Sequence, residues 1–209
     1  MSECLAIHPV TPQPRLVTGL VKSIREGALA VYPTDTCYAI GCLIGNKQGM
    51  ERIRRIRRLD DKHQFALLCR DLSDIALYAK VDNSAYRLLK ALTPGPYTFI
   101  LKATHEVPRR LQMPKRKSIG IRVPDHCLLE MVLAELGEGM MSSTLHLPGE
   151  AAPLSDPDEI RERMGHSVDV IVDSGAGGLL PTTIVDLTEG EARIVRQGKG
   201  ATDWLSHGD

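Results

Sequence analysis

The stretch Ala30-Val31-Tyr32-Pro33-Thr34-Asp35-Thr36-Cys37-Tyr38-Ala39-Ile40-Gly41-Cys42 is the most informative part of this chain. A short apolar run breaks at Pro33 into hydroxyls and a carboxylate. Because proline fixes φ and lacks an amide N–H, a strand carries it only at an edge or an end. The polar side chains of Thr34, Asp35, Thr36 and Tyr38 are therefore predicted to face a ligand. A strand-to-turn junction with solvated hydroxyls fits the spacing equally well.

Apolar periodicity on both sides of this stretch predicts short helices and strands that alternate along the chain. Expected helices cover 16–25, 47–58, 83–92, 128–136 and 157–164. Expected strands cover 28–32, 65–69, 97–102 and 168–173. Since the alternation has no strict βαβ rhythm, the sequence predicts an α/β fold with a mixed sheet.

Composition is typical of a compact protein with one domain spanning residues 1–209. The chain is 43% hydrophobic and 25% charged, close to the globular average and long enough for one sizeable core. No apolar run approaches the roughly 18 residues of a membrane span, and the N-terminus lacks a signal-peptide pattern, so we expect a cytoplasmic protein with no membrane partner. The scattered cysteines show no zinc spacing and are expected to be reduced and buried. They are Cys4, Cys37, Cys42, Cys69 and Cys127.

Five segments, in order, resemble motifs of the YrdC/YciO family, the threonylcarbamoyl-AMP synthases and their relatives. Residues 33–41 resemble Pro-Thr-Asp/Glu-Thr-x-Tyr-Gly-Leu-Gly, and residues 93–101 resemble the Trp-Pro-Gly-Pro-Leu-Thr strand. The remaining matches are 119–124, 181–186 and 195–198. The resemblance covers about 14–200 and is greatest to the YciO branch, through Arg109-Arg110 and their basic surroundings. It implies a YrdC-like twisted mixed β-sheet with flanking helices and a concave basic cavity.

The resemblance also implies a reaction. L-threonine, bicarbonate and ATP would give threonylcarbamoyl-AMP and pyrophosphate for tRNA modification, with Mg²⁺ on the triphosphate and no protein nucleophile. Matched by position, the residues that would contact threonine or its carbamate are Thr34, Tyr38, His63, Arg122 and Thr183. Those that would contact the nucleotide are Arg57, Ser143, Thr144 and Arg196. No Walker A motif occurs, so side chains must hold the ATP.

Two positions depart from the family pattern. The family's Lys-x-Arg pair aligns with Arg57 and Leu59, so the arginine is missing, and the asparagine of Ser-x-Asn aligns with His146. Loss of one preorganised donor costs on the order of 3 kcal/mol, about a hundredfold in rate. We therefore expect slow synthesis, and Leu59→Arg is predicted to raise it if Leu59 points into the site.

Net charge is zero, with 26 basic and 26 acidic residues, yet basic residues gather in two clusters. The first holds Arg52, Arg54, Arg55, Arg57, Arg58 and Lys62, and the second holds Arg109, Arg110, Lys115, Arg116 and Lys117. A solvated helix face is the plain interpretation of the first. Together they also predict a polyanion partner, either the ATP triphosphate or an RNA backbone.

An RNA-binding function is therefore the main alternative to synthesis. Aromatic residues make up only 4% of the chain, so base stacking on single strands has few platforms. Double-stranded RNA or tRNA, recognised by backbone and shape, is the partner that this alternative predicts. A third possibility is carbamoyl or adenylyl transfer to another amine.

Overall fold

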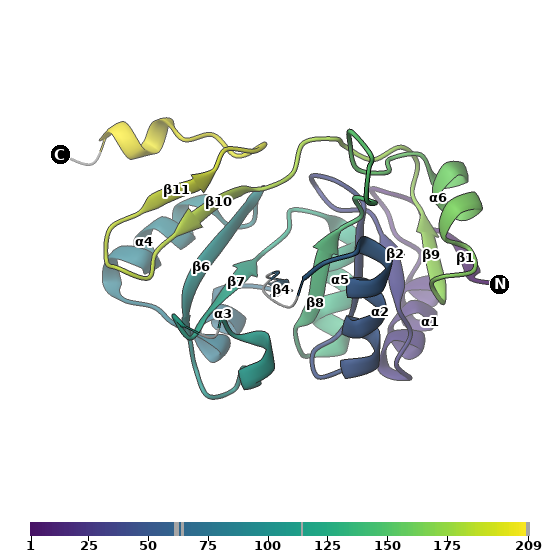
Figure 1. Ribbon diagram of the computed structural model, residues 1–209, viewed down its shortest axis with the longest axis horizontal. Helices are drawn as coiled ribbons and strands as arrows, with labels where there is room; N and C mark the ends of the chain where they lie inside the picture. The colour runs from purple at the N-terminus through teal and green to yellow at the C-terminus, as the bar shows by residue number, and fades with distance from the viewer. Residues whose placement is uncertain (61–62, 64, 114, 208–209) are drawn as a thin grey trace.

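A strongly twisted mixed sheet organises the chain (Figure 1). The structure is a computed structural model and describes residues 1–60, 63, 65–113 and 115–207. Along the sheet the strand order is β1-β9-β2-β3-β8-β4-β7-β6-β10-β11, and β5 pairs with β6 outside this path. The strands are β1 (Glu3–Ala6), β2 (Ala30–Tyr32), β3 (Ala39–Leu43), β4 (Ala66–Leu68), β5 (Ala79–Lys80), β6 (Tyr97–Ala103), β7 (Ser118–Arg122), β8 (Met140–Thr144), β9 (Val170–Asp173), β10 (Thr183–Asp186) and β11 (Arg193–Arg196).

Helices flank this sheet, as expected for an α/β fold. The α-helices are α1 (Pro14–Arg25), α2 (Lys47–Arg57), α3 (Leu72–Tyr78), α4 (Asn83–Leu92), α5 (Cys127–Leu136) and α6 (Pro157–Met164). Short 3-10 helices follow β6 and β11, namely η1 (Arg109–Leu111) and η2 (Asp203–His207). Among the described residues, no helix combines the length and apolar character needed to cross a membrane.

Side chains that alternate along the strands build a core on each face of the sheet. In β2, Val31 packs into the cluster that contains Met50 and Ile53 of α2. Its neighbours Ala30 and Tyr32 pack into the opposite cluster, with the buried residues of α1 and α5. Successive strand residues point to opposite faces, so three residues of one strand serve both cores. The sheet is therefore covered by helices on both sides, which is why β2 is apolar throughout.

The predicted elements and the observed ones agree wherever the periodic pattern is long. The helix expected over 83–92 is α4, and Asp156 caps α6 by accepting from the backbone N–H groups of Asp158 and Glu159. Pro33 lies just beyond β2, which pairs with β9 and β3, so it marks a strand end and not a sheet edge. Periodicity alone did not predict the seven-residue helix α3 or the short strands β1, β3, β5, β7, β8, β10 and β11, none of which is long enough to show a period. The expectation that all five cysteines are buried was also wrong, because Cys4 and Cys127 are exposed.

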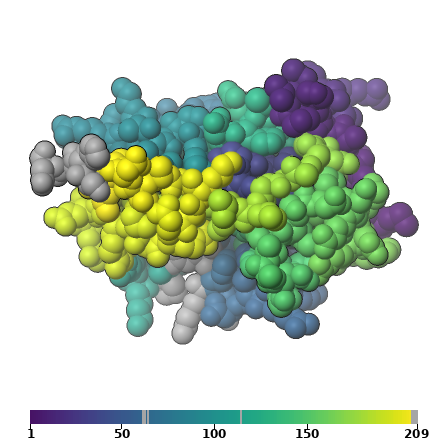
Figure 2. Space-filling view, turned by 90° about the horizontal axis from the view of Figure 1, so that it is seen from above, coloured from purple at the N-terminus to yellow at the C-terminus, as the bar shows by residue number. Residues whose placement is uncertain are grey.

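The twist brings the two halves of the sheet around a concave face. In Figure 1, β6, β10 and β11 stand on one side and β8, β2 and β9 on the other, with β7 and β4 between them. Seen from above, the C-terminal segment and the region around α6 lie on opposite sides of the molecule, and the chain before β10 runs between them (Figure 2). The strand ends on this face and the loops that follow them are where polar side chains converge.

Candidate functional site

A cavity of about 440 Å³ lies on the concave face, within the size range of small-molecule sites. Its walls come from the loop after β2, the end of α2, strands β6, β7, β8 and β11, and the segment before β10. The polar residues that line it are Thr36, Cys37, Arg57, His63, Thr98, Arg122, Ser142, Ser143, Thr144, His146, Thr182 and Arg196. Three arginines and two histidines are thus present, and no aspartate or glutamate is among the described lining residues.

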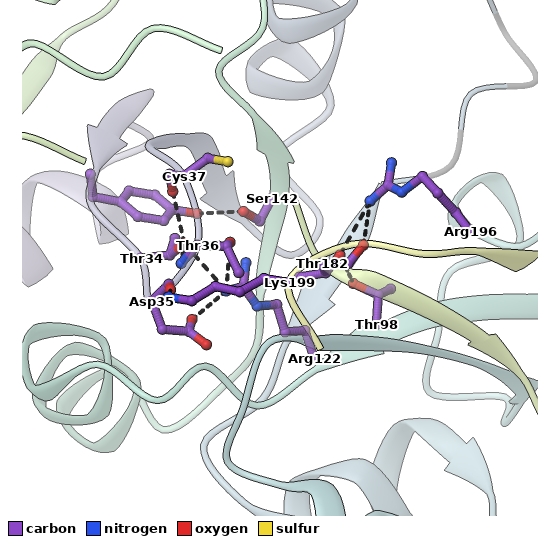
Figure 3. A network of polar contacts seen from close by, with 11 residues as sticks. Thr34, Asp35, Thr36, Cys37, Thr98, Arg122, Ser142, Thr182, Arg196 and Lys199 are labelled. Atoms are coloured by element: carbon purple, nitrogen blue, oxygen red, sulfur yellow. Dashed lines mark hydrogen bonds and ion pairs between the residues drawn. The ribbon is translucent and has the colours of Figure 1, made fainter. Parts of the chain in front are cut away.

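Arg122, the last residue of β7, is the centre of a buried polar network (Figure 3). Its side chain forms an ion pair with Asp35, and its Nη2 donates to Thr34 Oγ1 at 3.2 Å and Thr36 Oγ1 at 3.0 Å. Burial lowers the pKa of Arg122, while the Asp35 carboxylate acts in the opposite direction. The polar stretch after Pro33 therefore holds one buried guanidinium at the cavity wall.

The loop after Pro33 divides its side chains between this network and the core. Thr34 Oγ1 donates to the carbonyl of Cys37 at 2.7 Å and accepts from the N–H of Thr36 at 3.1 Å, which fixes a tight turn. Tyr38 is fully buried in the apolar core, and its hydroxyl donates to the carbonyl of Gly175 at 2.8 Å. The expectation that Thr34 and Tyr38 face a ligand freely is thus corrected: Thr34 supports Arg122, and Tyr38 anchors the loop.

Arg57 supplies the second cationic wall. It ends α2, and its Nε donates to the carbonyl of His146 at 3.1 Å, while Nη1 donates to the Ser143 hydroxyl. Burial lowers the pKa of Arg57. Arg57, Ser143 and Thr144, which the resemblance assigned to the nucleotide, therefore meet at one wall, and His146 lines the cavity beside them.

Leu59 does not line the cavity and instead packs, partly buried, against the core. The backbone reverses at Arg58, which adopts a left-handed conformation with φ of 48°, and this turns the following residue away. The premise behind the Leu59→Arg variant is therefore wrong. We now expect that change to lower stability without raising a rate, because a guanidinium would enter an apolar contact.

Arg196 supplies the third cationic wall, from β11. Its Nη2 donates to the carbonyl of Thr182 at 2.8 Å, and the Thr182 hydroxyl contacts that of Thr98 at 2.8 Å. Thr183 is fully buried, and its hydroxyl donates to the carbonyl of Gly200 at 2.6 Å. Thr182, and not the predicted Thr183, therefore faces the cavity, because adjacent residues of an extended chain point to opposite sides.

The C-terminal segment also connects the two sides of the cavity. Lys199 Nζ donates to the carbonyl of Asp35 at 2.5 Å (Figure 3). A Cβ on Gly198 would lie 2.3 Å from the carbonyl oxygen of Pro181, so only glycine allows the segment to lie this close to the start of β10. The chain after β11 is thereby fixed next to the loop that binds Arg122.

The members of the two predicted basic clusters divide between local contacts and exposed surface. Several members have local partners: Arg52 pairs with Asp169, Arg54 lies over the Phe65 ring, Arg57 lines the cavity, Arg110 donates to Gly45 and Arg116 pairs with Asp186. Exposed side chains belong to Arg55, Arg58, Arg109, Lys115 and Lys117. Lys62 lies outside the described residues, as does Gln64. The clusters therefore include structural contacts as well as free surface charge.

Sequence reasoning did not single out Thr98, Ser142 and Thr182 as lining residues. Ser142 neighbours the predicted Ser143 on β8, and Thr98 lies on a strand whose alternation was visible. For Ser142 the available signal was the hydroxyl of Thr144 two positions along β8, whereas Thr98 and Thr182 have no hydroxyl two positions away. Which face a hydroxyl occupies depends on the register of pairing, which a single sequence does not show.

Comparisons with known proteins agree with this architecture. Residues 22–198 match the family model Sua5_yciO_yrdC, described as "Telomere recombination". The chain is 52% identical to YciO of Escherichia coli (strain K12) over 96% of this chain and 97% of that protein. The crystal structure of E. coli YciO superposes with a TM-score of 0.92, covering 96% of this chain and 98% of that one.

Two more distant matches have a named activity or a bound ligand. The threonylcarbamoyl-AMP synthase of Serratia proteamaculans (strain 568) is 24% identical over 88% of this chain and 96% of that protein. P. abyssi Sua5, solved in complex with L-threonine, shares the fold with a TM-score of 0.89 at 20% identity, over 99% of this chain and 60% of that chain. The cavity, the ordered motifs and these matches together show that the chain belongs to the Sua5/YciO/YrdC family.

Proposed function

We propose that this chain makes threonylcarbamoyl-AMP from L-threonine, bicarbonate and ATP. One observation carries the proposal: Arg57, Arg122 and Arg196, from three separate elements, line the same cavity. Among the described residues, no carboxylate lines it. Every substrate in this reaction is anionic or carries a carboxylate, so a wall of guanidinium groups fits each of them. The relationship to threonylcarbamoyl-AMP synthases supports the choice of threonine.

In this proposal Arg122 and the hydroxyl of Thr36 bind the carboxylate side of the amino acid. Arg122 is held in place by Thr34 and Asp35, so it is oriented before a ligand arrives. Arg57, Ser143 and Arg196 bind the nucleotide phosphates. Arg57 is already desolvated, and burial strengthens the interaction of its charge with a phosphate.

The chemistry requires two condensations and no covalent intermediate with the protein. The amine of threonine takes up bicarbonate with loss of water, and an oxygen of the resulting carbamate attacks the α-phosphorus of ATP with release of pyrophosphate. Catalysis then comes from holding the reactants in line and stabilising the charge that develops on the phosphoryl oxygens. No group of three or more acidic, histidine or cysteine side chains suited to a metal occurs among the described residues, so Mg²⁺ would be held through the triphosphate.

Calorimetry tests the binding step. L-threonine is titrated into the protein together with a non-hydrolysable ATP analogue, and the parent is compared with Arg122→Ala and Arg57→Ala. Arg161→Ala is the matched control, since Arg161 pairs with Asp158 on the surface of α6. We expect the first two variants to weaken threonine and nucleotide binding respectively, by at least tenfold. Equal heats for all four proteins would refute the proposal.

Binding of duplex RNA or tRNA is the second candidate. The exposed cations Arg55, Arg58, Arg109, Lys115 and Lys117 support it, because none of them lines the cavity. Binding of tRNA would also be consistent with a reaction whose product is transferred to tRNA. Because ATP and tRNA are both present in the cytoplasm, we propose that the reaction takes place there.

A further inference from the structure

Lys199 reaches across the concave face from the C-terminal segment to the loop after β2. Its Nζ donates to the carbonyl of Asp35 at 2.5 Å, and Figure 3 shows the side chain extended between the two. Among the described residues, no other group donates to this carbonyl. A hydrogen bond from an ammonium group is charge-assisted and is about twice as strong as one between neutral groups. One cation therefore joins two parts of the chain that lie far apart in the sequence.

The backbone around Lys199 is held tightly, so its side chain starts from a fixed point. The N–H of Lys199 donates to the carbonyl of Pro181 at 2.8 Å. A Cβ on Gly198 would lie 2.3 Å from that carbonyl oxygen, and a Cβ on Gly200 would lie 2.4 Å from a ring carbon of Tyr97. Both neighbours of Lys199 must therefore be glycine for the segment to lie this close to β6 and to the start of β10.

The carbonyl that Lys199 holds belongs to the loop that orients Arg122. Arg122 Nη2 donates to the hydroxyls of Thr34 and Thr36, and the guanidinium pairs with the carboxylate of Asp35. In the chain, the Asp35 carbonyl lies between these two threonines. Fixing it limits rotation of the peptide units that carry all three acceptors. The contact with Lys199 therefore stabilises the arrangement around the guanidinium.

The place of Lys199 favours a role through this loop over direct contact with a ligand. Lys199 is not among the residues that line the cavity, whereas Cys37 and Arg122 are. Burial raises the pKa of the Cys37 thiol, and the charges of Arg122, Arg196 and Lys199 act in the opposite direction. The ammonium thus lies close to the cavity wall but behind it.

We propose that Lys199 is a positioning residue for Arg122, acting through the backbone of Asp35. It holds the loop of Thr34, Asp35 and Thr36 in the conformation that orients the guanidinium toward the cavity. The inference rests on the proposed function only where threonine is named as the ligand of Arg122. The orientation of Arg122 itself is measurable without any ligand.

Three variants test the role of Lys199. Lys199→Met removes the ammonium and keeps an apolar side chain of similar length. Lys199→Arg keeps a cationic donor and is the rescue variant. Lys90→Met removes an exposed lysine of α4 and is the matched control.

The readouts separate the loop from the C-terminal segment. The N–H of Thr36 donates to Thr34 Oγ1 at 3.1 Å, so its hydrogen exchange rate reports on the loop. The ¹H–¹⁵N signal of Arg122 Nε reports on the guanidinium, and the backbone N–H of residue 199 reports on the C-terminal segment. Calorimetry gives the threonine Kd.

In Lys199→Met we expect exchange of the Thr36 N–H to quicken and the threonine Kd to rise, each by about tenfold, the scale of one hydrogen bond to a charged group. We also expect the Arg122 signal of the ligand-free protein to shift. Lys199→Arg should recover most of each change, and Lys90→Met should match the parent.

Two results would overturn the proposal. Weaker threonine binding in Lys199→Met, with Thr36 exchange and the Arg122 signal unchanged, would mean that Lys199 acts on the ligand by its charge. Faster exchange at residue 199 alone would mean that it only holds the C-terminal segment. Absence of threonine binding in every protein, with Thr36 and Arg122 still responding to Lys199→Met, would count against the proposed function and leave the positioning role supported.

Discussion

Arg122 is a buried charge whose neutralisation depends on one carboxylate. Its side chain is 8% exposed and that of Asp35 is 10% exposed. Removing one partner of a buried pair is strongly destabilising, because the other charge remains desolvated, whereas apolar replacement of both is often tolerated. The pair is therefore expected to serve orientation and binding more than net stability.

Arg122→Leu alone should lower the free energy of unfolding by about 3–5 kcal/mol, the usual effect of leaving a buried charge unpaired. The double variant Arg122→Leu with Asp35→Leu should recover most of that loss, yet should not bind threonine. Urea unfolding monitored by circular dichroism measures the first quantity, and calorimetry the second. A double variant less stable than the single one would mean that the pair itself stabilises the fold.

Acid should destabilise the protein in two separate windows. Burial lowers the pKa of His63 and of His126, so both stay neutral in the folded chain after the unfolded chain has begun to take up protons. Since the unfolded pKa of histidine is about 6.5, stability should begin to fall as the pH drops below that value. Asp169 and Asp186 have lowered pKa values in the folded chain. Their contribution to stability is therefore fully present above the unfolded pKa of about 3.9 and is lost as the pH falls from there through the folded pKa.

Urea unfolding of the parent and of His63→Gln with His126→Asn, compared at pH 7.5 and 5.5, checks the first window. The variant should lose less stability over this interval than the parent does. Identical losses would assign the acid sensitivity to other groups.

At residue scale, sequence reasoning located the polar loop and most of the charges, but it failed where one position decides the direction of a side chain. Thr182 and Thr183 are adjacent and both buried, and the pairing of β10 with β6 determines which of them lines the cavity. Alignment with motifs assigned Tyr38 to the threonine and put Leu59 in the place of the missing arginine. A motif carries residue identity, but the direction of a side chain depends on the packing around it.

At the scale of elements, the pairing of β2 with β3 depends on a missing side chain. A Cβ on Gly41 would lie 2.3 Å from the hydroxyl oxygen of Tyr32 and 2.6 Å from the carbonyl oxygen of Met141. That hydroxyl donates to Ser142 at 3.0 Å, which connects β2 to β8 across β3. Gly41 therefore allows the buried tyrosine to cross its neighbouring strand.

Gly41→Ala should lower stability by about 1–3 kcal/mol, as overpacking of a dense core does. The matched control is Gly19→Ala in α1, where an added Cβ meets nothing within 4 Å. That variant should raise stability by about 0.5–1 kcal/mol, the difference between glycine and alanine in a helix. Thermal melting distinguishes the two, and a Gly41→Ala protein as stable as the parent would contradict the packing described here.

Helices of ten or more residues were predictable because an amphipathic stripe repeats often enough to be seen. Strand partners were not, because β2 lies between β3 and β9, which are separated from each other by more than a hundred residues. Such long-range pairing leaves no local pattern. The resemblance to a family, and not periodicity, supplied the concave sheet.

At the scale of the whole molecule, surface charge bears on the choice between the two candidate functions. Duplex RNA or tRNA should bind weakly and with little sequence preference. Each neutralised phosphate contributes about −0.9 to the slope of log affinity against log salt on B-form DNA, and we expect a similar value here. Arg55→Glu with Arg58→Glu should reduce both affinity and slope in a filter-binding assay, with Arg161→Glu as the control. Unchanged binding would indicate that these arginines are solvated surface residues that do not contact RNA.

Synthesis of the adenylate is the most direct measurement of the central claim. The purified chain is incubated with radiolabelled L-threonine, bicarbonate, ATP and Mg²⁺, and the products are separated by chromatography. Label should move into a threonylcarbamoyl-AMP peak that requires both ATP and bicarbonate, and Arg122→Ala should reduce that peak at least a hundredfold, the effect of removing one preorganised donor and its orientation. Label that stays entirely in threonine, in a protein shown by calorimetry to be folded and to bind nucleotide, would contradict the proposed function.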